Sequence, residues 1–177
     1  MSRTGSHIVL IGFMGSGKST IGRLLAERLE CPLLDMDEII TEREKMSITD
    51  IFEKKGEHYF RKIESQVLQE ALNSHEPSVI STGGGAPCHL GGMAYILRKS
   101  DSFYLKVGRD RLLQRIVGDR SRPLVKNKTK QELQQFIHET LKKRETIYKR
   151  ANHIVAAFDR PERIAERLIK RSHKKKV

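Results

Sequence analysis

The stretch HIVLIGFMGSGKST, residues 7–20, decides the fold of this chain. It begins with a short apolar run whose β-branched content favours a buried strand over a helix. Gly12 stops that run, and positions 12–19 satisfy the pattern G-x-x-x-x-G-K-[ST]. From Ile21 to Leu29 the apolar residues recur at helical spacing. A strand, a glycine-rich loop and a helix in this order are the context that the pattern requires.

This loop has the chemistry of a phosphate-binding site. Backbone N–H groups at the start of a helix attract anions, and glycines let the backbone come close to them. We expect Lys18 to reach the β- and γ-phosphates of a nucleoside triphosphate, as a catalytic residue, and the Ser19 hydroxyl to ligate Mg²⁺. A chance match would arise in fewer than about one chain in a hundred. The nucleotide contacts predicted in the loop are Gly15, Ser16, Gly17, Lys18, Ser19 and Thr20.

Strands and helices alternate along the rest of the chain. Further strands are predicted at 32–37, 78–82, 102–107 and 153–158, and helices at 37–45, 47–56, 57–73, 92–98, 109–117, 130–150 and from Pro161 onward. Such alternation implies a parallel sheet covered on both faces. We therefore predict one domain over residues 1–177, built as a three-layer α/β/α sandwich around a central five-stranded parallel sheet.

Composition narrows the class of protein. Hydrophobic residues make up 37% and charged residues 32%, yet apolar blocks recur throughout, so wholesale disorder is not expected. Two cysteines cannot form a disulfide framework or a four-cysteine zinc site. No apolar run is long enough to cross a bilayer, and the glycine-rich sequence begins too early for a secretory signal. We expect a soluble, cytoplasmic, monomeric protein that does not bind membranes.

The net charge of +12 is unevenly distributed, because residues 160–177 alone carry +6. One interpretation is a frayed, solvated C-terminus, and the other is a weak polyanion-binding tail over about 170–177. We favour the first, so nucleic acid is not an expected partner.

Two aspartates stand at the end of the second predicted strand. If the strand is still extended there, the side chains of Asp35 and Asp37 point to one face, close enough to share a metal shell and an acceptor hydroxyl. A carboxylate in that place can orient or deprotonate a nucleophilic hydroxyl. The alternative is that one of them caps the next helix.

The run Gly83-Gly84-Gly85 ends the third predicted strand and sacrifices stability, because glycine loses much backbone entropy on folding. One or two glycines would suffice for a tight turn. A third favours close approach of a ligand to the backbone.

Arginines on two predicted helices are further candidates. Arg61 and Glu64 have i, i+3 spacing, which alone indicates a surface ion pair. Arg144 falls on the apolar stripe of its helix, where a guanidinium requires an anionic partner. That partner is either an internal carboxylate or a substrate anion in a cleft.

Residues 118–130 are charged and without a clear period. They indicate a mobile loop, either a solvated one or a lid that supplies arginine charge to transferring phosphate.

Taken together, these motifs resemble those of shikimate kinase, in the nucleoside-monophosphate-kinase-like group of P-loop proteins. The resemblance spans about residues 8–165. It is carried in order by GFMGSGKSTIG (12–22), LLDMDEII (33–40), FRKIE (60–64), STGGG (81–85), RPL (122–124) and RETIY (144–148).

The resemblance implies Mg-ATP-dependent phosphorylation of the 3-hydroxyl of shikimate, toward chorismate and the aromatic amino acids. It implies that Asp37 holds the acceptor hydroxyl as a catalytic residue, and that Asp35 belongs to the Mg²⁺ shell through water. Arg61 and Arg144 would clamp the substrate carboxylate. Gly83, Gly84 and Gly85 would line the acceptor pocket.

The same resemblance makes Arg122 the lid residue that contacts ATP and the transferring phosphate in catalysis. Arg115 and Pro161 would flank the adenine. Residues of about 37–66 would form an acceptor-binding lobe, and 118–130 the lid.

Two rival functions remain open on the sequence. A gluconate or nucleoside monophosphate kinase would share the phosphate loop but not the set Asp37, Arg61, Gly83–Gly85 and Arg144. A catalytically silent P-loop module would bind nucleotide and, through its basic tail, nucleic acid or protein. The presence of Lys18, Ser19, Asp35 and Asp37 argues against the second.

Overall fold

The computed structural model describes residues 6–117 and 123–174, and its centre is a sheet of five parallel strands. They lie in the order β2-β3-β1-β4-β5. β1 is the central strand. Because all strands are parallel, the loop that follows β1 lies at the carboxyl ends of the strands, where open α/β sheets bind ligands. The strands are β1 (His7–Ile11), β2 (Leu33–Asp35), β3 (Val79–Ser81), β4 (Ser100–Lys106) and β5 (His153–Ala156).

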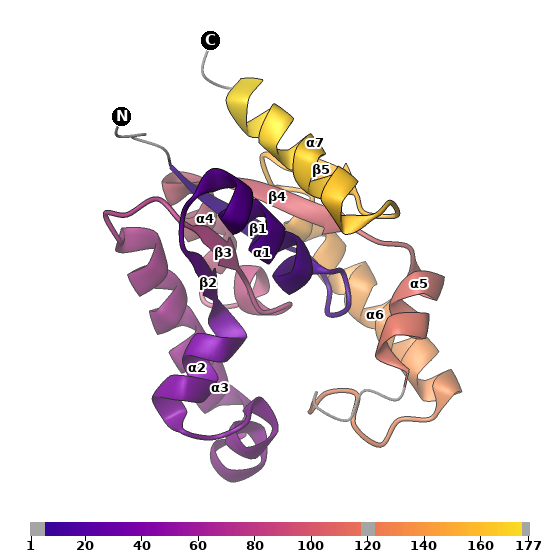
Figure 1. The fold of residues 1–177 in the computed structure, drawn as a ribbon. Helices are drawn as coiled ribbons and strands as arrows, with labels where there is room; N and C mark the ends of the chain where they lie inside the picture. Colours follow the sequence, from indigo (N-terminus) through magenta and orange to yellow (C-terminus); the bar gives the residue numbers. More distant parts are fainter. Residues whose placement is uncertain (1–5, 118–122, 175–177) are drawn as a thin grey trace.

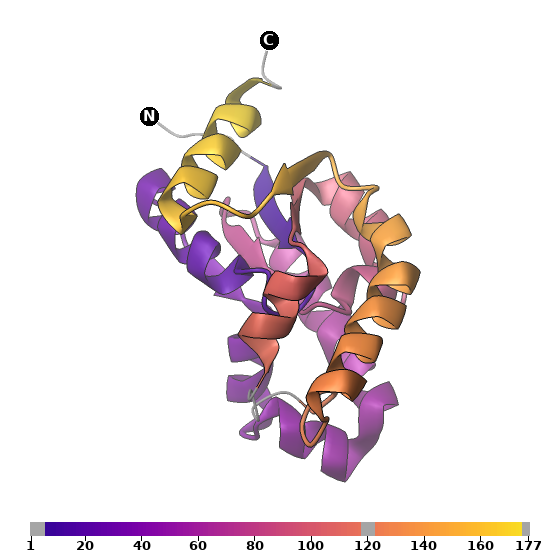
Figure 2. The same ribbon diagram turned by 90° about the vertical axis from the view of Figure 1, so that its right-hand side faces the viewer.

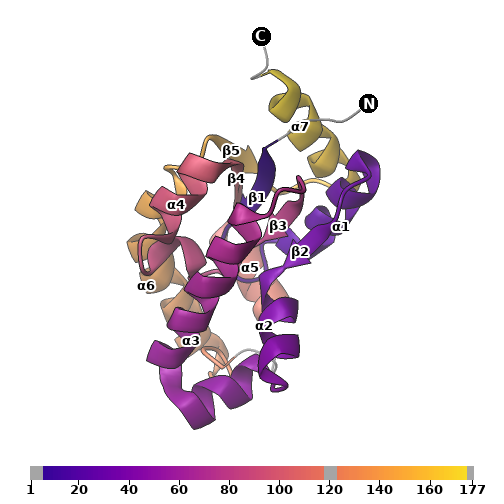
Figure 3. The ribbon, with the colours of Figure 1, turned by 90° about the vertical axis from the view of Figure 1, so that its left-hand side faces the viewer.

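Helices cover both faces of this sheet. α1 and α7 pack against each other on one face (Figure 1), and α3, α4 and α6 lie on the other (Figure 3). The predicted three-layer sandwich with a five-stranded parallel sheet is thus confirmed. The helices are α1 (Lys18–Leu29), α2 (Met36–Glu44), α3 (Ile48–Asn73), α4 (Gly92–Lys99), α5 (Arg109–Ile116), α6 (Lys130–Tyr148) and α7 (Pro161–Lys174), with a 3₁₀ turn, η1 (Ala86–Cys88).

Helix α3 is two helical segments joined at Gly56. The Ser47 side chain caps its start by accepting a hydrogen bond from the Asp50 N–H, as the sequence predicted. Gly56 has φ +83° and ψ 166°, outside the helical region, at a φ that side chains disfavour. The kink sends the first segment away from the sheet beside α2 (Figure 3). The acceptor-lobe residues therefore stand out from the sheet.

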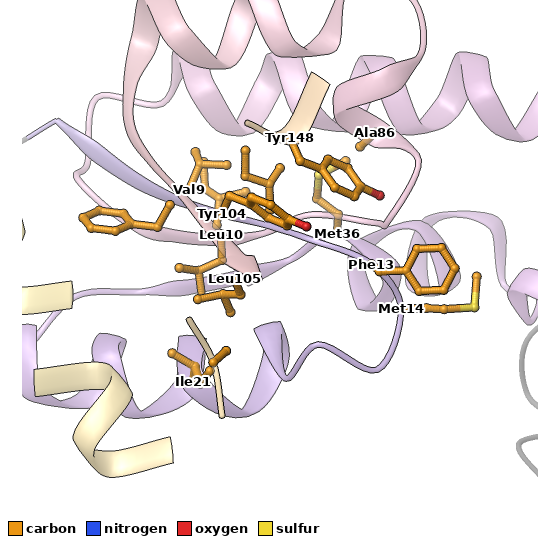
Figure 4. Packing of buried hydrophobic residues seen from close by; sticks show 14 of the residues in the cluster. Val9, Leu10, Phe13, Met14, Ile21, Met36, Ala86, Tyr104, Leu105 and Tyr148 are labelled. Carbon is orange, nitrogen blue, oxygen red and sulfur yellow. The ribbon is translucent and has the colours of Figure 1, made fainter. Parts of the chain in front are cut away.

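The core is formed where the central strands meet helices from both layers. Val9 and Leu10 of β1 and Leu105 of β4 are fully buried, with Ile21 of α1 beside them (Figure 4). On the other face the rings of Tyr104 and Tyr148 pack with centroids 5.2 Å apart. The buried strands explain why their sequences are continuous apolar runs.

Element boundaries differ from the predictions by a few residues. The strand predicted at 153–158 ends at Ala156, because its last partner on β4 is Lys106, where β4 itself ends. Phe158 lies beyond the sheet and is exposed. β4 begins at Ser100, two residues early, because Ser100 pairs with His7 of β1. Pairing between strands, which one segment's pattern does not contain, decided these ends.

Candidate functional site

Two pockets meet at the carboxyl ends of the strands. The first, of about 330 Å³, surrounds the loop between β1 and α1. The second, of about 240 Å³, lies between α3, α6 and the glycine run after β3. Asp37 and Gly84 line both pockets, so the two are adjoining. This adjacency suits a transfer between two bound molecules.

The first pocket gathers every described residue predicted to contact nucleotide. Lys18 lies with its Nζ donating to the carbonyl oxygens of Gly12 (2.9 Å) and Phe13 (3.0 Å). Arg115 of α5 donates to the Gly15 carbonyl at 2.9 Å, which brings the distant helix against the loop. The pocket is lined by Gly15, Ser16, Gly17, Lys18, Ser19, Thr20, Ile21, Asp37, Ser81, Thr82, Gly84, Arg115, Ala157, Asp159, Pro161 and Ile164.

The two aspartates differ in position. Asp35 is the last residue of β2 and the N-cap of α2, and its Oδ1 accepts a hydrogen bond from the Asp37 N–H at 3.1 Å. Its Oδ2 accepts a hydrogen bond from the Ser19 hydroxyl at 2.6 Å. The expectation of two side chains on one face of an extended strand is wrong, because α2 begins at Met36. The capping alternative is right for Asp35, which also faces the phosphate loop.

The second pocket gathers every residue predicted to bind the acceptor. Apolar side chains of α3 and the described end of the loop after α5 complete its wall. It is lined by Met14, Asp37, Ile48, Phe52, Phe60, Arg61, Glu64, Gly83, Gly84, Gly85, Pro123, Leu124 and Arg144.

Arg61 and Glu64 form a buried ion pair in this pocket. Arg61 Nη1 donates to Glu64 Oε2 at 2.7 Å, and the two side chains are 8% and 2% exposed. The expectation of a surface pair is therefore wrong, because Glu64 lies on the same buried helix face as Phe60, Val67 and Leu68. Burial raises the pKa of the Glu64 carboxyl, while the charge of Arg61 opposes that shift.

The second oxygen of Glu64, Oε1, is buried without a hydrogen-bond partner among the described residues. It lies against Gly83, where a Cβ would overlap it. A Cβ on Gly85 would likewise overlap the Arg61 guanidinium. Gly83 and Gly85 thus allow the ion pair to lie directly on the backbone. This packing explains two of the three glycines without a ligand.

Arg144 of α6 faces the second pocket, and its charge also acts on an internal carboxylate, because it opposes the rise in the pKa of Glu64. It is partly exposed and lines the second pocket, with Nη1 3.7 Å from the position of a Cβ on Gly84. Arg61 reaches the same pocket from α3. Two guanidinium groups on one small pocket suit bidentate binding of an anion.

The loop after α5 is described only from Pro123. The predicted lid residue Arg122 lies outside the described residues. Leu124 lines the second pocket, Val125 is buried, and Lys126 donates to Glu53 of α3 at 3.0 Å. Thr129 and Glu132 form a reciprocal capping box at the start of α6 (Figure 2 shows α6 beside α5). The described end of the loop is thus tied to the acceptor side.

Sequence reasoning left some lining residues unassigned. Glu64 was treated only as a surface partner, although its spacing of four from Phe60 and three from Val67 placed it on the apolar face. Phe52 and Phe60 had no predicted role at the site, and their rings pack with centroids 4.7 Å apart on the pocket wall. Asp159 and Thr82 had no local signal, because tertiary folding alone brings them to the first pocket.

Comparisons with known proteins agree with this geometry. Residues 14–173 match the family model described as shikimate kinase. A shikimate kinase of Azobacteroides pseudotrichonymphae is 43% identical over 147 residues, or 82% of this chain and 86% of that protein. Within the described residues, no helix is both long and apolar enough to span a membrane.

Two solved structures are similar over almost the whole chain. A shikimate kinase from Acinetobacter baumannii in complex with shikimate superposes with a TM-score of 0.93 at 31% identity, covering 98% of this chain and 96% of that one. A shikimate kinase from Bacteroides thetaiotaomicron gives 0.88 at 36% identity, with 95% and 98% covered.

Proposed function

The chain belongs to the shikimate kinase family, so it is an ATP-dependent phosphotransferase acting on shikimate, and we propose how its two adjoining pockets perform the reaction. The observation that supports the proposal is that Asp37 and Gly84 line both pockets. ATP occupies the first pocket and shikimate the second. The γ-phosphoryl group then passes to the 3-hydroxyl beside Asp37, giving shikimate 3-phosphate and ADP.

The nucleotide is bound chiefly by backbone and by Lys18. The N–H groups of residues 15–20 at the start of α1 surround the β- and γ-phosphates. The Lys18 ammonium, which lies over the loop carbonyls, moves onto the phosphates and stabilises the charge that develops during transfer. Arg115 and Pro161, which line the same pocket, flank the adenine.

The residues beside the loop fit a magnesium ion. Ser19 and Asp35 present a hydroxyl and a carboxylate oxygen 2.6 Å apart, and Mg²⁺ prefers oxygen ligands. Among the described residues no cluster of three or more acidic, histidine or cysteine side chains could hold a metal by itself. Ser19, and Asp35 through water, would hold such an ion beside the phosphates, where it would supply positive charge.

The acceptor is held by charge at one end and by Asp37 at the other. Arg61 and Arg144 bind the shikimate carboxylate, and the backbone of Gly83, Gly84 and Gly85 contacts the hydroxyl side. Asp37 accepts the hydrogen bond of the 3-hydroxyl, orients it toward the γ-phosphate, and takes its proton as the new P–O bond forms.

The lid excludes water from the transfer. Leu124 and the Lys126–Glu53 pair bring the described part of the 118–130 loop over the lobe of residues 37–66. Arg122, one residue before Pro123, contacts ATP and the transferring phosphate when the loop closes. Exclusion of water suppresses hydrolysis of ATP. We place the chain in the cytoplasm as one monomeric domain of residues 1–177. Of the basic tail predicted over about 170–177, the residues up to Lys174 belong to α7.

The test is an ADP-release assay with Mg-ATP and three acceptors: shikimate, gluconate and CMP. Release that depends on shikimate alone supports the proposal. Release with gluconate or CMP instead would assign a related small-metabolite kinase. ATP binding without release for any acceptor would favour the silent P-loop module.

A further inference from the structure

Tyr148, the last residue of α6, joins that helix to the glycine run. Its side chain is fully buried, and its hydroxyl donates a hydrogen bond to the Gly84 carbonyl oxygen. The ring packs on Tyr104 of β4, as Figure 4 shows. Burial raises the pKa of the Tyr148 hydroxyl, so it remains a neutral donor throughout the physiological pH range.

The three carbonyls of the glycine run are satisfied in two different ways. The Gly83 carbonyl accepts from the Ala86 N–H at 3.2 Å, and the Gly85 carbonyl accepts from the Cys88 N–H at 2.8 Å. Both bonds are local and belong to the turn at η1. The Gly84 carbonyl instead depends on a side chain 64 positions away.

This hydrogen bond determines the orientation of one peptide plane. The Gly84 C=O and the Gly85 N–H belong to the same planar, trans peptide, so they point in opposite directions. Holding the carbonyl toward Tyr148 therefore holds the Gly85 N–H away from α6. Among the described residues, the backbone hydrogen bonds of the turns and loops leave the Gly85 N–H unused. It remains available to a ligand.

The same helix also positions the anion-binding end of the pocket. Arg144 lies four residues before Tyr148, about one helical turn away. Gly84 lies between Arg144 and the phosphate loop, because a Cβ on it would be 3.3 Å from the Met14 N and 3.7 Å from Arg144 Nη1. α6 thus fixes the distance between the Arg144 side chain and the Gly84–Gly85 peptide.

We propose that Tyr148 is a positioning residue for the acceptor. Its hydroxyl orients the Gly84–Gly85 peptide so that the Gly85 N–H donates to an acceptor hydroxyl while Arg144 binds the carboxylate of the same molecule. The inference rests on the proposed function, because it requires the acceptor to occupy the second pocket. Without the hydroxyl, the flexible glycine plane rotates and the acceptor is held less well for transfer.

The chain contains a matched control in the same pair of rings. Tyr104 is also buried, but it lines a different cavity, which contains no residue of the glycine run. Tyr148→Phe and Tyr104→Phe each remove one hydroxyl from the same aromatic pair. Only the first removes the contacts of the hydroxyl with the Gly84 carbonyl and with Arg144, and the Gly85 amide readout below separates the two.

The experiment compares steady-state kinetics of both variants with wild type, varying shikimate and ATP separately. For Tyr148→Phe we expect kcat/KM for shikimate to fall by about tenfold, the size of one lost hydrogen bond, with KM for ATP within about twofold. For Tyr104→Phe all constants should stay within about twofold. Thermal unfolding of both variants checks folding.

A second readout follows the Gly85 amide directly. Its ¹H–¹⁵N resonance should shift on titration of wild type with shikimate and shift less in Tyr148→Phe, even if that variant is less stable. If the two variants had equal kinetic constants, or if Tyr148→Phe lost kcat/KM equally for shikimate and for ATP, the role of Tyr148 would be overturned. The proposed function would still stand. No shikimate-dependent turnover or binding by wild type would overturn the proposed function and this inference with it.

Discussion

The Arg61 guanidinium and the Glu64 carboxylate form an ion pair at 2.7 Å, almost completely buried, one helical turn apart on α3. Arg61 has a second, more exposed partner in Glu57 at 2.9 Å. Two partners hold the guanidinium against Gly85 on the wall of the second pocket. The pair therefore links the stability of α3 to the geometry of the acceptor site.

Glu64→Ala should destabilise the fold by about 3 kcal/mol, because it leaves Arg61 buried with only an exposed partner. It should also raise KM for shikimate more than KM for ATP. Glu57→Ala is the matched control and should cost less than about 1 kcal/mol, because Glu57 is half exposed. Urea unfolding and kinetics measure both effects. Equal losses of stability in the two variants would contradict the interpretation that Glu64 is the stronger partner of Arg61.

Asp35→Asn should separate helix capping from metal binding. Asparagine caps helices about as well as aspartate, so the free energy of unfolding should change little. The carboxylate that faces Ser19 is lost, so the Mg²⁺ concentration for half-maximal activity should rise by about tenfold or more. Ser47→Ala, at the cap of α3 and outside both pockets, is the control. An unchanged Mg²⁺ requirement in Asp35→Asn would argue against Asp35 in the metal shell.

Arg144→Ala should raise KM for shikimate by about tenfold or more and leave KM for ATP nearly unchanged, because Arg144 lines only the second of the two pockets. Lys143→Ala, exposed on the same helix, controls for loss of charge on α6. Equal increases in both KM values for Arg144→Ala would exclude its assignment as a carboxylate clamp.

Cys88 should react slowly with alkylating reagents at neutral pH. Burial raises the pKa of its thiol to about 11, while Arg144 and Arg61 oppose that shift. In a Cys31→Ser background the alkylation rate should therefore rise with a midpoint near pH 11, above the value of about 8.5 for an ordinary thiol. A midpoint close to 8.5 would show an exposed thiol instead.

The raised pKa of the Cys88 thiol also makes the stability of the fold depend on pH. The fold favours the neutral thiol, so the contribution of Cys88 is complete below about pH 9 and is lost as pH rises toward 11. Cys88→Ala should lose less stability over that range than wild type. Urea unfolding at pH 8 and pH 10.5 measures the difference, and parallel losses in the two proteins would contradict it.

Thr129→Ala should lower the free energy of unfolding by about 1 kcal/mol, because Thr129 caps α6 and shares a reciprocal capping box with Glu132. Thr129→Ser keeps the hydroxyl and should retain most of that stability. The start of α6 adjoins the lid, so Thr129→Ala should also increase amide exchange at residues 130–133. If the serine variant were destabilised as much as alanine, capping would not be the cause.

Much of the fold could be predicted because its signals are local. The buried strands are continuous apolar runs, Ser47 and Gly56 mark the ends of a helical segment, and the loop at 12–19 requires a strand before it and a helix after it. Strand ends were less accurate, since Ser100 and Ala156 belong to the sheet only through partners elsewhere in the chain.

By itself, the sequence determined the layered α/β architecture and the phosphate loop, because periodicity and glycine spacing are properties of neighbouring residues. Only the tertiary structure decided that Glu64 is buried against Gly83, that Asp35 contacts Ser19, and that Tyr148 holds the Gly84 carbonyl. These contacts join elements that are far apart in the chain. Their energies depend on burial and distance, which arise only when the sheet and its helices have packed together.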